Sequence, residues 1–137
     1  MYKRQDLACE AGAKYIITPN VNTDVIRYAN SLGMVTMPGA FTPSEIEEAH
    51  RAGADFVKVF PAGQLGTDYI RAIKAPLNHI ALLAVGGVNE NNLKDFLNAG
   101  VVGFGIGGNL VNQEWIKNGQ FDRIAELART YVENVRQ

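Results

Sequence analysis

Short apolar runs recur along the chain, and their first residues are about 20 to 25 positions apart, as successive βα units require. Between the runs, apolar residues return at helical spacing instead, such as Ile46 and Ala49, or Leu93, Phe96 and Leu97. The pattern therefore alternates between strands and helices. The runs that we predict to be strands are Tyr15–Thr18, Met34–Met37, Phe56–Phe60, Ile80–Val85 and Val101–Ile106.

At four places a glycine separates a helical segment from the next predicted strand, whereas the loops after the strands differ from one another. A glycine just past a helix adopts the left-handed conformation at little cost. These glycines are Gly12, Gly33, Gly53 and Gly100. Uniform joints before strands and varied loops after them are typical of a (β/α)8 TIM barrel. A doubly wound sheet is the alternative, but no GxGxxG motif opens a helix after an early strand.

The chain has 137 residues, which suffices for one α/β domain but falls short of the ~200 or more of a complete barrel. We therefore predict the C-terminal part of a barrel, strands four to eight, over residues 6–137. It ends in a helix over 121–135, whose apolar face holds Ile124, Leu127, Ala128, Tyr131 and Val135. Residues 1–5 fit none of these elements, and we interpret them as a fragment boundary or a non-native scar. An in-frame stop codon just before Met1 would contradict that interpretation.

Composition narrows the class of partner. The chain is 47% hydrophobic and 20% charged, with a formal net charge of -1, so it lacks the basic surface typical of nucleic-acid or membrane binding. A small-molecule partner is the better prediction. The lone Cys9 excludes an internal disulfide, and no apolar stretch is long enough to span a bilayer. These features favour a cytoplasmic protein.

One lysine interrupts the apolar run FVKVF. Side chains alternate along a strand, so Lys58 shares a face with Phe56 and Phe60, while Val57 and Val59 face the helices. A lysine in this position can reach the solvent at an edge or pair with an acid. If it is buried without a partner, its pKa falls, and the neutral amine is a nucleophile that forms Schiff bases with carbonyl compounds.

Two glycine pairs, Gly86-Gly87 and Gly107-Gly108, end the last two predicted strands. Barrels commonly hold a phosphate group there with backbone N–H groups, because a Cβ atom would block the approach of the anion. A single pair would indicate only a tight turn, but two pairs one βα unit apart favour phosphate. His50 and His79 show no metal-ligand spacing, so no metal is expected.

The motifs FVKVFPA, LLAVGGV and GFGIGGNLV, preceded by ITPNVN and MPGAFTPSEIEEAHRAGAD, closely resemble the 2-keto-3-deoxy-6-phosphogluconate (KDPG) / 4-hydroxy-2-oxoglutarate (KHG) aldolases. The resemblance runs from about residue 7 to the C-terminus. It implies a (β/α)8 barrel, a homotrimer when full length, and a class I aldolase that needs neither a metal nor another cofactor. The substrate implied is a small phosphorylated keto acid, cleaved to pyruvate and glyceraldehyde 3-phosphate, or KHG, cleaved to pyruvate and glyoxylate.

By the same resemblance, Lys58 is the Schiff-base lysine, and Pro38 and Phe60 line the pyruvate pocket. The remaining substrate-binding positions lie at the phosphate end of the site and are Gly86, Gly87, Gly108 and Asn109. The family's general acid/base glutamate and its carboxylate-binding arginine come from early strands that this chain lacks.

Three departures from the family pattern leave alternatives open. The stretch Ala84-Val85-Gly86-Gly87 replaces the Pro-Thr-Gly-Gly usual in the gluconate branch and is similar to the phosphogalactonate branch, while Asn109 replaces a frequent serine and Gly63 a frequent glutamate. The alternatives are a 2-keto-3-deoxy-6-phosphogalactonate aldolase, an inactive fragment that binds phosphorylated ligands or self-associates through open sheet edges, and a phosphate-binding barrel enzyme without a Schiff base.

Overall fold

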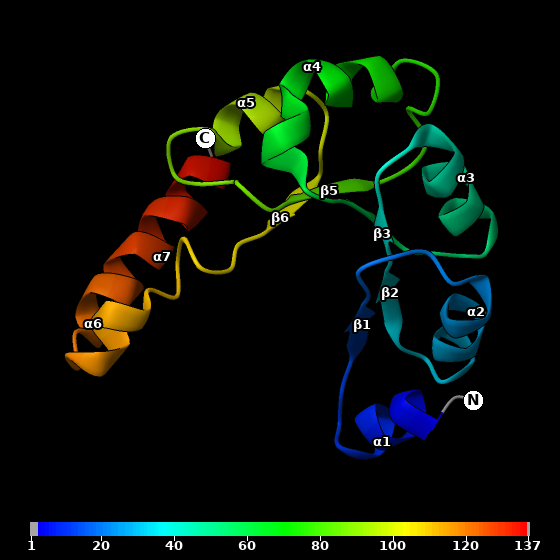
Figure 1. The fold of residues 1–137 in the computed structure, drawn as a ribbon, viewed down its shortest axis with the longest axis horizontal. Helices are drawn as coiled ribbons and strands as arrows, with labels where there is room; N and C mark the ends of the chain where they lie inside the picture. Colours follow the sequence, from blue (N-terminus) through cyan, green and yellow to red (C-terminus); the bar gives the residue numbers. More distant parts are fainter. Residues whose placement is uncertain (1–2, 137) are drawn as a thin grey trace.

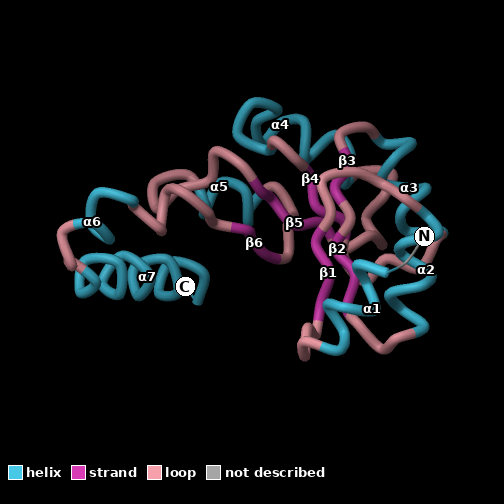
Figure 2. The backbone as a smooth tube through the Cα atoms, turned by 60° about the horizontal axis from the view of Figure 1, so that its bottom comes forward, coloured by secondary structure: helices cyan, strands magenta, loops and turns pink. Residues whose placement is uncertain are grey.

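The computed structural model describes residues 3–136, in which all paired strands run parallel. Strand β1 pairs with β2, and β3, β4, β5 and β6 follow one another in a second ladder (Figure 2). The bounds are β1 Tyr15–Ile17, β2 Val35–Met37, β3 Gly39–Ala40, β4 Val57–Val59, β5 Leu82–Val85 and β6 Gly103–Gly105. Each predicted strand is therefore present, in the predicted order.

A proline separates the predicted strand β2 from a further short strand, β3. Pro38 separates the two, yet its carbonyl accepts a hydrogen bond of 2.9 Å from the Lys58 N–H, so β4 follows both pieces. Gly39 is paired with Lys58 in the parallel register. Our prediction that Gly39 and Ala40 belong to a loop was wrong, because the backbone resumes strand pairing directly after the proline.

Helices cover one side of the curved sheet. Figure 1 shows α2, α3, α4 and α5 along this side, while α6 and α7 extend beyond its β6 end. Their bounds are α1 Lys3–Glu10, α2 Thr23–Ser31, α3 Pro43–Arg51, α4 Ala62–Lys74, α5 Leu93–Asn98, α6 Gln113–Lys117 and α7 Phe121–Arg136. Within residues 3–136, no helix has the length and apolarity needed to cross a membrane.

Helix α1 includes three of the first five residues. We expected residues 1–5 to fit no element, but residues 3–5 form the first turn of α1, and residues 1 and 2 lie outside the described part of the chain. The Tyr28 hydroxyl of α2 donates a 2.6 Å hydrogen bond to Asp6. The first described turn is thus continuous with a helix that is joined to the rest of the fold.

The two faces of the sheet differ in burial. Val57, Val59 and Leu82 are fully buried on the helix-covered face, as alternation along β4 predicted. Tyr15 and Ile17 of β1 are 57% and 52% exposed. These apolar side chains share the face opposite α2, so the inner face of the sheet is uncovered at its β1 end. The four glycines predicted to follow helices all have positive φ values, between 72° and 106°.

The last helix matches its predicted bounds to within one residue, but its predicted apolar face is only partly buried. Tyr131 is buried against the core, whereas Val135 is 46% exposed. Val135 therefore does not belong to the core, although it was predicted to share the apolar face of this helix. Helix α7 packs on α5 and α6, so only part of its length has the body of the domain beside it (Figure 1).

Helix α3 begins with a reciprocal cap that supports a stability prediction. Thr42 Oγ1 accepts from the Glu45 N–H, and the Glu45 carboxylate accepts from the N–H groups of Phe41 and Thr42. Replacing Thr42 by alanine removes one half of this capping box, and we expect a loss of about 1 kcal/mol of unfolding free energy in urea titrations. The neighbouring Ser44→Ala is the control, because no hydrogen bond of the described residues uses its hydroxyl, and an equal loss there would contradict the assignment.

The same cap makes the loss of unfolding free energy in Thr42→Ala depend on pH. The hydrogen bonds from Phe41 and then Thr42 hold the pKa of Glu45 below its ordinary value. The carboxylate's contribution is therefore present above the ordinary glutamate pKa and disappears as the pH falls through the lowered one. Thr42→Ala keeps both backbone N–H donors and removes only the 2.9 Å bond from the Thr42 hydroxyl to this carboxylate. The difference between wild type and Thr42→Ala is therefore expected to narrow in acid by the contribution of that one bond.

Candidate active site

Lys58 lies in the middle of β4 with a paired strand on each side. It is opposite Gly39 of β3 and Leu83 of β5, and the residue is only 8% exposed. Among residues 3–136, no carboxylate forms an ion pair with its amine. Burial therefore lowers the pKa of Lys58 below the ordinary lysine value. The structure confirms the buried lysine, and the lowered pKa increases the fraction of neutral, nucleophilic amine near neutral pH.

Phe60 connects this amine to the first glycine loop. Its ring centroid is 5.3 Å from Lys58 Nζ, which places both side chains on the same face of β4, and the residue is 44% exposed. The ring also approaches Gly86, where a Cβ atom would lie 3.0 Å from Phe60 Cε2. Amine, aromatic ring and glycine loop are thus contiguous at the carboxyl ends of β4 and β5, where parallel strands of barrels carry their active sites.

The first turn of α4 and the loop after β5 meet through glycine backbone. The Gly63 N–H donates a 2.7 Å hydrogen bond to the Gly86 carbonyl. A Cβ atom at Gly63 would lie 2.8 Å from Gly87 Cα, a distance that side chains do not tolerate. Gly86 and Gly87 have φ values of 85° and 77°, a conformation that glycine adopts readily. The glutamate frequent in the family at the Gly63 position would not fit this loop geometry.

The structure brings most, but not all, of the predicted site residues together. The carbonyl of buried Pro38 accepts a hydrogen bond from the Lys58 N–H, and Asn109 Nδ2 donates a 2.7 Å hydrogen bond to the Val88 carbonyl. Gly108 is exposed, and within residues 3–136 no other residue comes within 4 Å of a Cβ built there.

Sequence reasoning missed Asn92 and the contact made by Gly63. Asn92 Nδ2 donates a 2.9 Å hydrogen bond to the Gly87 carbonyl. The available signal was an asparagine immediately before a predicted helix, but that signal indicates a helix cap. Asn92 does occupy the N-cap position of α5, yet its side chain makes no capping bond and is turned to the loop instead.

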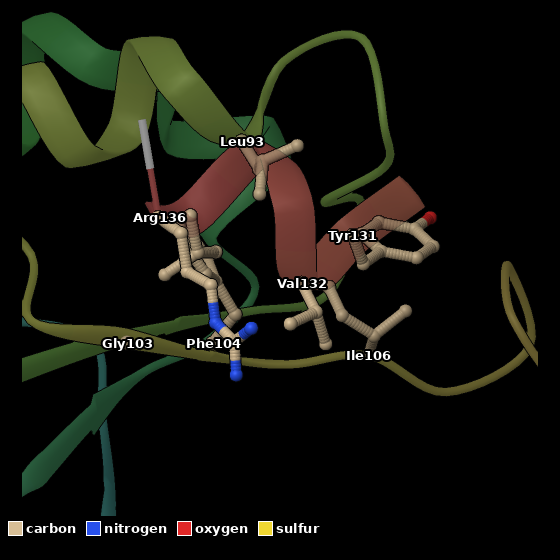
Figure 3. A pocket seen from close by; sticks show the side chains of 8 residues that line it. Leu93, Gly103, Phe104, Ile106, Tyr131, Val132 and Arg136 are labelled. Atoms are coloured by element: carbon tan, nitrogen blue, oxygen red, sulfur yellow. The ribbon is translucent and has the colours of Figure 1, made fainter. Parts of the chain in front are cut away.

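A cavity of about 300 Å³ lies elsewhere, between β6 and α7 (Figure 3). Apolar groups of Phe104, Ile106 and Val132 dominate its lining. The Tyr131 hydroxyl there donates to Glu90 at 3.1 Å, and burial raises the pKa of Tyr131, which makes the phenol a poorer nucleophile. The cavity therefore differs from the surroundings of Lys58, where burial favours the nucleophilic form of the side chain.

Comparison with known proteins agrees with this geometry. The model of the KDPG and KHG aldolase family matches residues 2–127. The chain belongs to this family. A curated relative, 2-dehydro-3-deoxy-6-phosphogalactonate aldolase of Escherichia coli, is 39% identical over 134 residues, which cover 96% of this chain and 63% of the relative.

Solved structures give the same family. The native KDPGal structure superposes with a TM-score of 0.85 at 36% identity, covering 100% of this chain and 67% of that chain. A KDPG aldolase of Legionella pneumophila, captured with pyruvate as a covalent carbinolamine intermediate, has a TM-score of 0.79 at 28% identity and covers 87% of this chain and 58% of that chain. The chain thus has a parallel α/β fold of TIM-barrel type and spans less than two thirds of the curated relative above.

Proposed function

We propose that this KDPG/KHG aldolase family chain carries the Schiff-base half of a class I aldolase site, with Lys58 as the nucleophile. The observation behind the proposal is a buried lysine with no ion-pair partner in the described chain, next to a glycine loop. A lysine whose amine is partly neutral reacts with a ketone, and loop amides with no side chain above them suit a phosphate.

In the proposed reaction, the neutral Lys58 amine attacks the substrate C2 ketone, and loss of water leaves an iminium. The C4 hydroxyl then gives its proton to a general base, which in the family comes from the earlier strands, and the C3–C4 bond breaks. Its electron pair moves toward the iminium to give an enamine, while the aldehyde leaves. Protonation of the enamine carbon and hydrolysis of the iminium release pyruvate and restore the amine. Pro38 and Phe60 would line the pyruvate pocket, and Gly86, Gly87, Gly108 and Asn109 the phosphate end.

The substrates that we propose are 2-keto-3-deoxy-6-phosphogluconate and 4-hydroxy-2-oxoglutarate. A second candidate is 2-keto-3-deoxy-6-phosphogalactonate, which is favoured by the Ala84-Val85-Gly86-Gly87 stretch and by the 39% identity to the Escherichia coli phosphogalactonate aldolase. Initial rates with the two 6-phosphosugar acids, which differ in configuration, distinguish these candidates.

We further propose that the described strands correspond to strands four to eight of a barrel. Support comes from the exposed inner-face residues Tyr15, Ile17 and Val35 and from the 63% coverage of the relative. The family's general acid/base and carboxylate-binding residues would then belong to the earlier strands. A cytoplasmic homotrimer is proposed for the whole enzyme, on the family resemblance alone.

Borohydride trapping with pyruvate tests the Schiff-base proposal on the chain as it stands. Reduction of the iminium would leave a pyruvyl adduct, which peptide mass mapping is expected to place on Lys58. The exposed Lys14 provides the internal comparison, because a solvated lysine on the same chain should remain unmodified. Modification of Lys14 and Lys58 to the same extent, or no adduct at all, would contradict the proposal and favour the inactive-fragment alternative.

A further inference from the structure

The Gly86–Asn89 segment is held by hydrogen bonds to three consecutive carbonyl groups, each from a different part of the chain. The Gly86 carbonyl accepts from the Gly63 N–H at 2.7 Å, the Gly87 carbonyl from Asn92 Nδ2 at 2.9 Å, and the Val88 carbonyl from Asn109 Nδ2 at 2.7 Å. Hydrogen bonds to three successive carbonyl groups fix the orientation of three successive peptide planes.

Fixing a carbonyl also fixes the N–H group of the same peptide unit. These peptide bonds are trans, because the only cis bond among the described residues is Phe60-Pro61. In a trans peptide the C=O and N–H groups point in opposite directions. The bond from Gly63 therefore sets the direction of the Gly87 N–H, and the bond from Asn92 sets that of the Val88 N–H.

These two N–H groups have no hydrogen-bond partner in the described part of the chain. No hydrogen bond within residues 3–136 uses the amide N–H of Gly87 or Val88. The next amide is different, because the Asn89 N–H donates to Asn92 Oδ1 at 2.8 Å. Asn92 thus binds the segment at the Gly87 carbonyl and at the Asn89 N–H, and the Gly87 and Val88 N–H groups remain as two adjacent donors. Two adjacent amides without partners are the arrangement that anion-binding loops use.

We propose that Asn92 is a positioning residue for the phosphate group of the substrate, acting through the Val88 amide. The proposal rests on the proposed function for its substrate, but the anion subsite itself can be tested separately. The position of Asn92 supports the proposal, because an asparagine at an N-cap ordinarily uses its side chain for the helix, and here both side-chain atoms serve the loop. The backbone N–H of Gly63 orients the Gly87 amide in the same way, through its hydrogen bond to the Gly86 carbonyl.

The test is a titration of the ¹⁵N-labelled chain with inorganic phosphate, followed by NMR. In wild type, the Gly87 and Val88 amide resonances are expected to shift saturably. Asn92→Asp keeps a good N-cap residue and the acceptor for the Asn89 N–H, but it loses the donor to the Gly87 carbonyl. We expect its Kd for phosphate to rise about tenfold, as loss of a favourable hydrogen-bond arrangement to an anion implies.

Asn91→Asp is the matched control, because it adds the same charge one residue away on an exposed side chain. Its Kd is expected to stay within about twofold of wild type. Asn92→Ala, which adds no charge, should weaken binding like Asn92→Asp, and thermal unfolding checks that both variants fold. Absence of saturable shifts in wild type, wild-type affinity in the Asn92 variants, or an equal loss in Asn91→Asp would overturn the proposal.

This titration and the pyruvate trapping fail independently. Pyruvate carries no phosphate, so an adduct on Lys58 without phosphate binding would remove the positioning role and leave the aldolase proposal intact. Phosphate binding that depends on Asn92, with no adduct on Lys58, would leave an anion site in a chain that lacks the proposed chemistry.

Discussion

Replacement of Lys58 by methionine is expected to abolish the pyruvyl adduct and, at the same time, to stabilise the fold at neutral pH. Methionine keeps an unbranched side chain of similar length in the space between β3 and β5 but has no amine. The adduct should be lost completely, since no other residue is proposed as a nucleophile. The gain in stability follows because a buried ammonium without a counter-ion costs free energy that an apolar side chain does not.

The stability difference should depend on pH in a defined direction. Burial lowers the pKa of Lys58 in the folded chain, so between the lowered and the ordinary value the unfolded chain binds more protons. Wild-type stability therefore rises with pH across that interval, whereas the methionine variant lacks this contribution. The gain from Lys58→Met should be largest below the lowered pKa and should shrink as the pH approaches the ordinary lysine value.

Urea titrations at neutral and alkaline pH, together with adduct mapping, measure both effects. Lys14→Met is the control, because Lys14 is exposed and its replacement should change neither trapping nor the pH dependence. A methionine variant less stable than wild type at neutral pH would show that the Lys58 amine is a structural group. An adduct that survives the substitution would place the reactive amine elsewhere.

The strand pattern and the buried lysine could be predicted because both depend on local sequence. Apolar spacing identified each main strand. Alternation along β4 placed Lys58 on the face opposite to that of Val57 and Val59. The short strand β3 was not predicted, because Gly39-Ala40 follows a proline and has no apolar run. Its pairing with β4 is specified by the neighbouring strands. The exposure of Val135 could not be predicted, because periodicity marks an apolar face without indicating whether anything covers it.

The arrangement around the glycine loop could not be predicted from spacing. The loop is held by Gly63, Asn92 and Asn109, which belong to three different segments, and each bond depends on tertiary placement. A glycine in place of a frequent glutamate looked like a departure from the family. In the structure it is the residue that lets two backbones approach, since a side chain there would meet Gly87.

Substitution of Gly39 by alanine is expected to be the most destabilising single-methyl change at a glycine of this chain. A Cβ atom at this position would lie 2.3 Å from the Pro19 carbonyl oxygen and 2.6 Å from its carbon. Both atoms are backbone, so no side-chain rotation relieves the contact. Relief requires moving the loop after β1 or the β3 strand, and we expect a loss of about 3 kcal/mol or more in urea titrations.

Gly107→Ala is the control that tests whether the steric clash causes the stability loss in Gly39→Ala. Gly107, like Gly39, lacks a positive φ, but no other residue lies within 4 Å of a Cβ built there. Its substitution should be neutral or stabilise by up to about 1 kcal/mol, because alanine restricts only the unfolded chain. Similar losses of unfolding free energy at the two positions would show that the steric clash is not the cause.

The packing of β3 also affects the surroundings of the Lys58 amine. Because Gly39 is paired with Lys58 across β3 and β4, a shift of β3 moves the backbone next to the amine. Any Gly39→Ala chain that remains folded should therefore trap less pyruvate than Gly107→Ala, which couples the packing of this strand to the reactivity of the lysine.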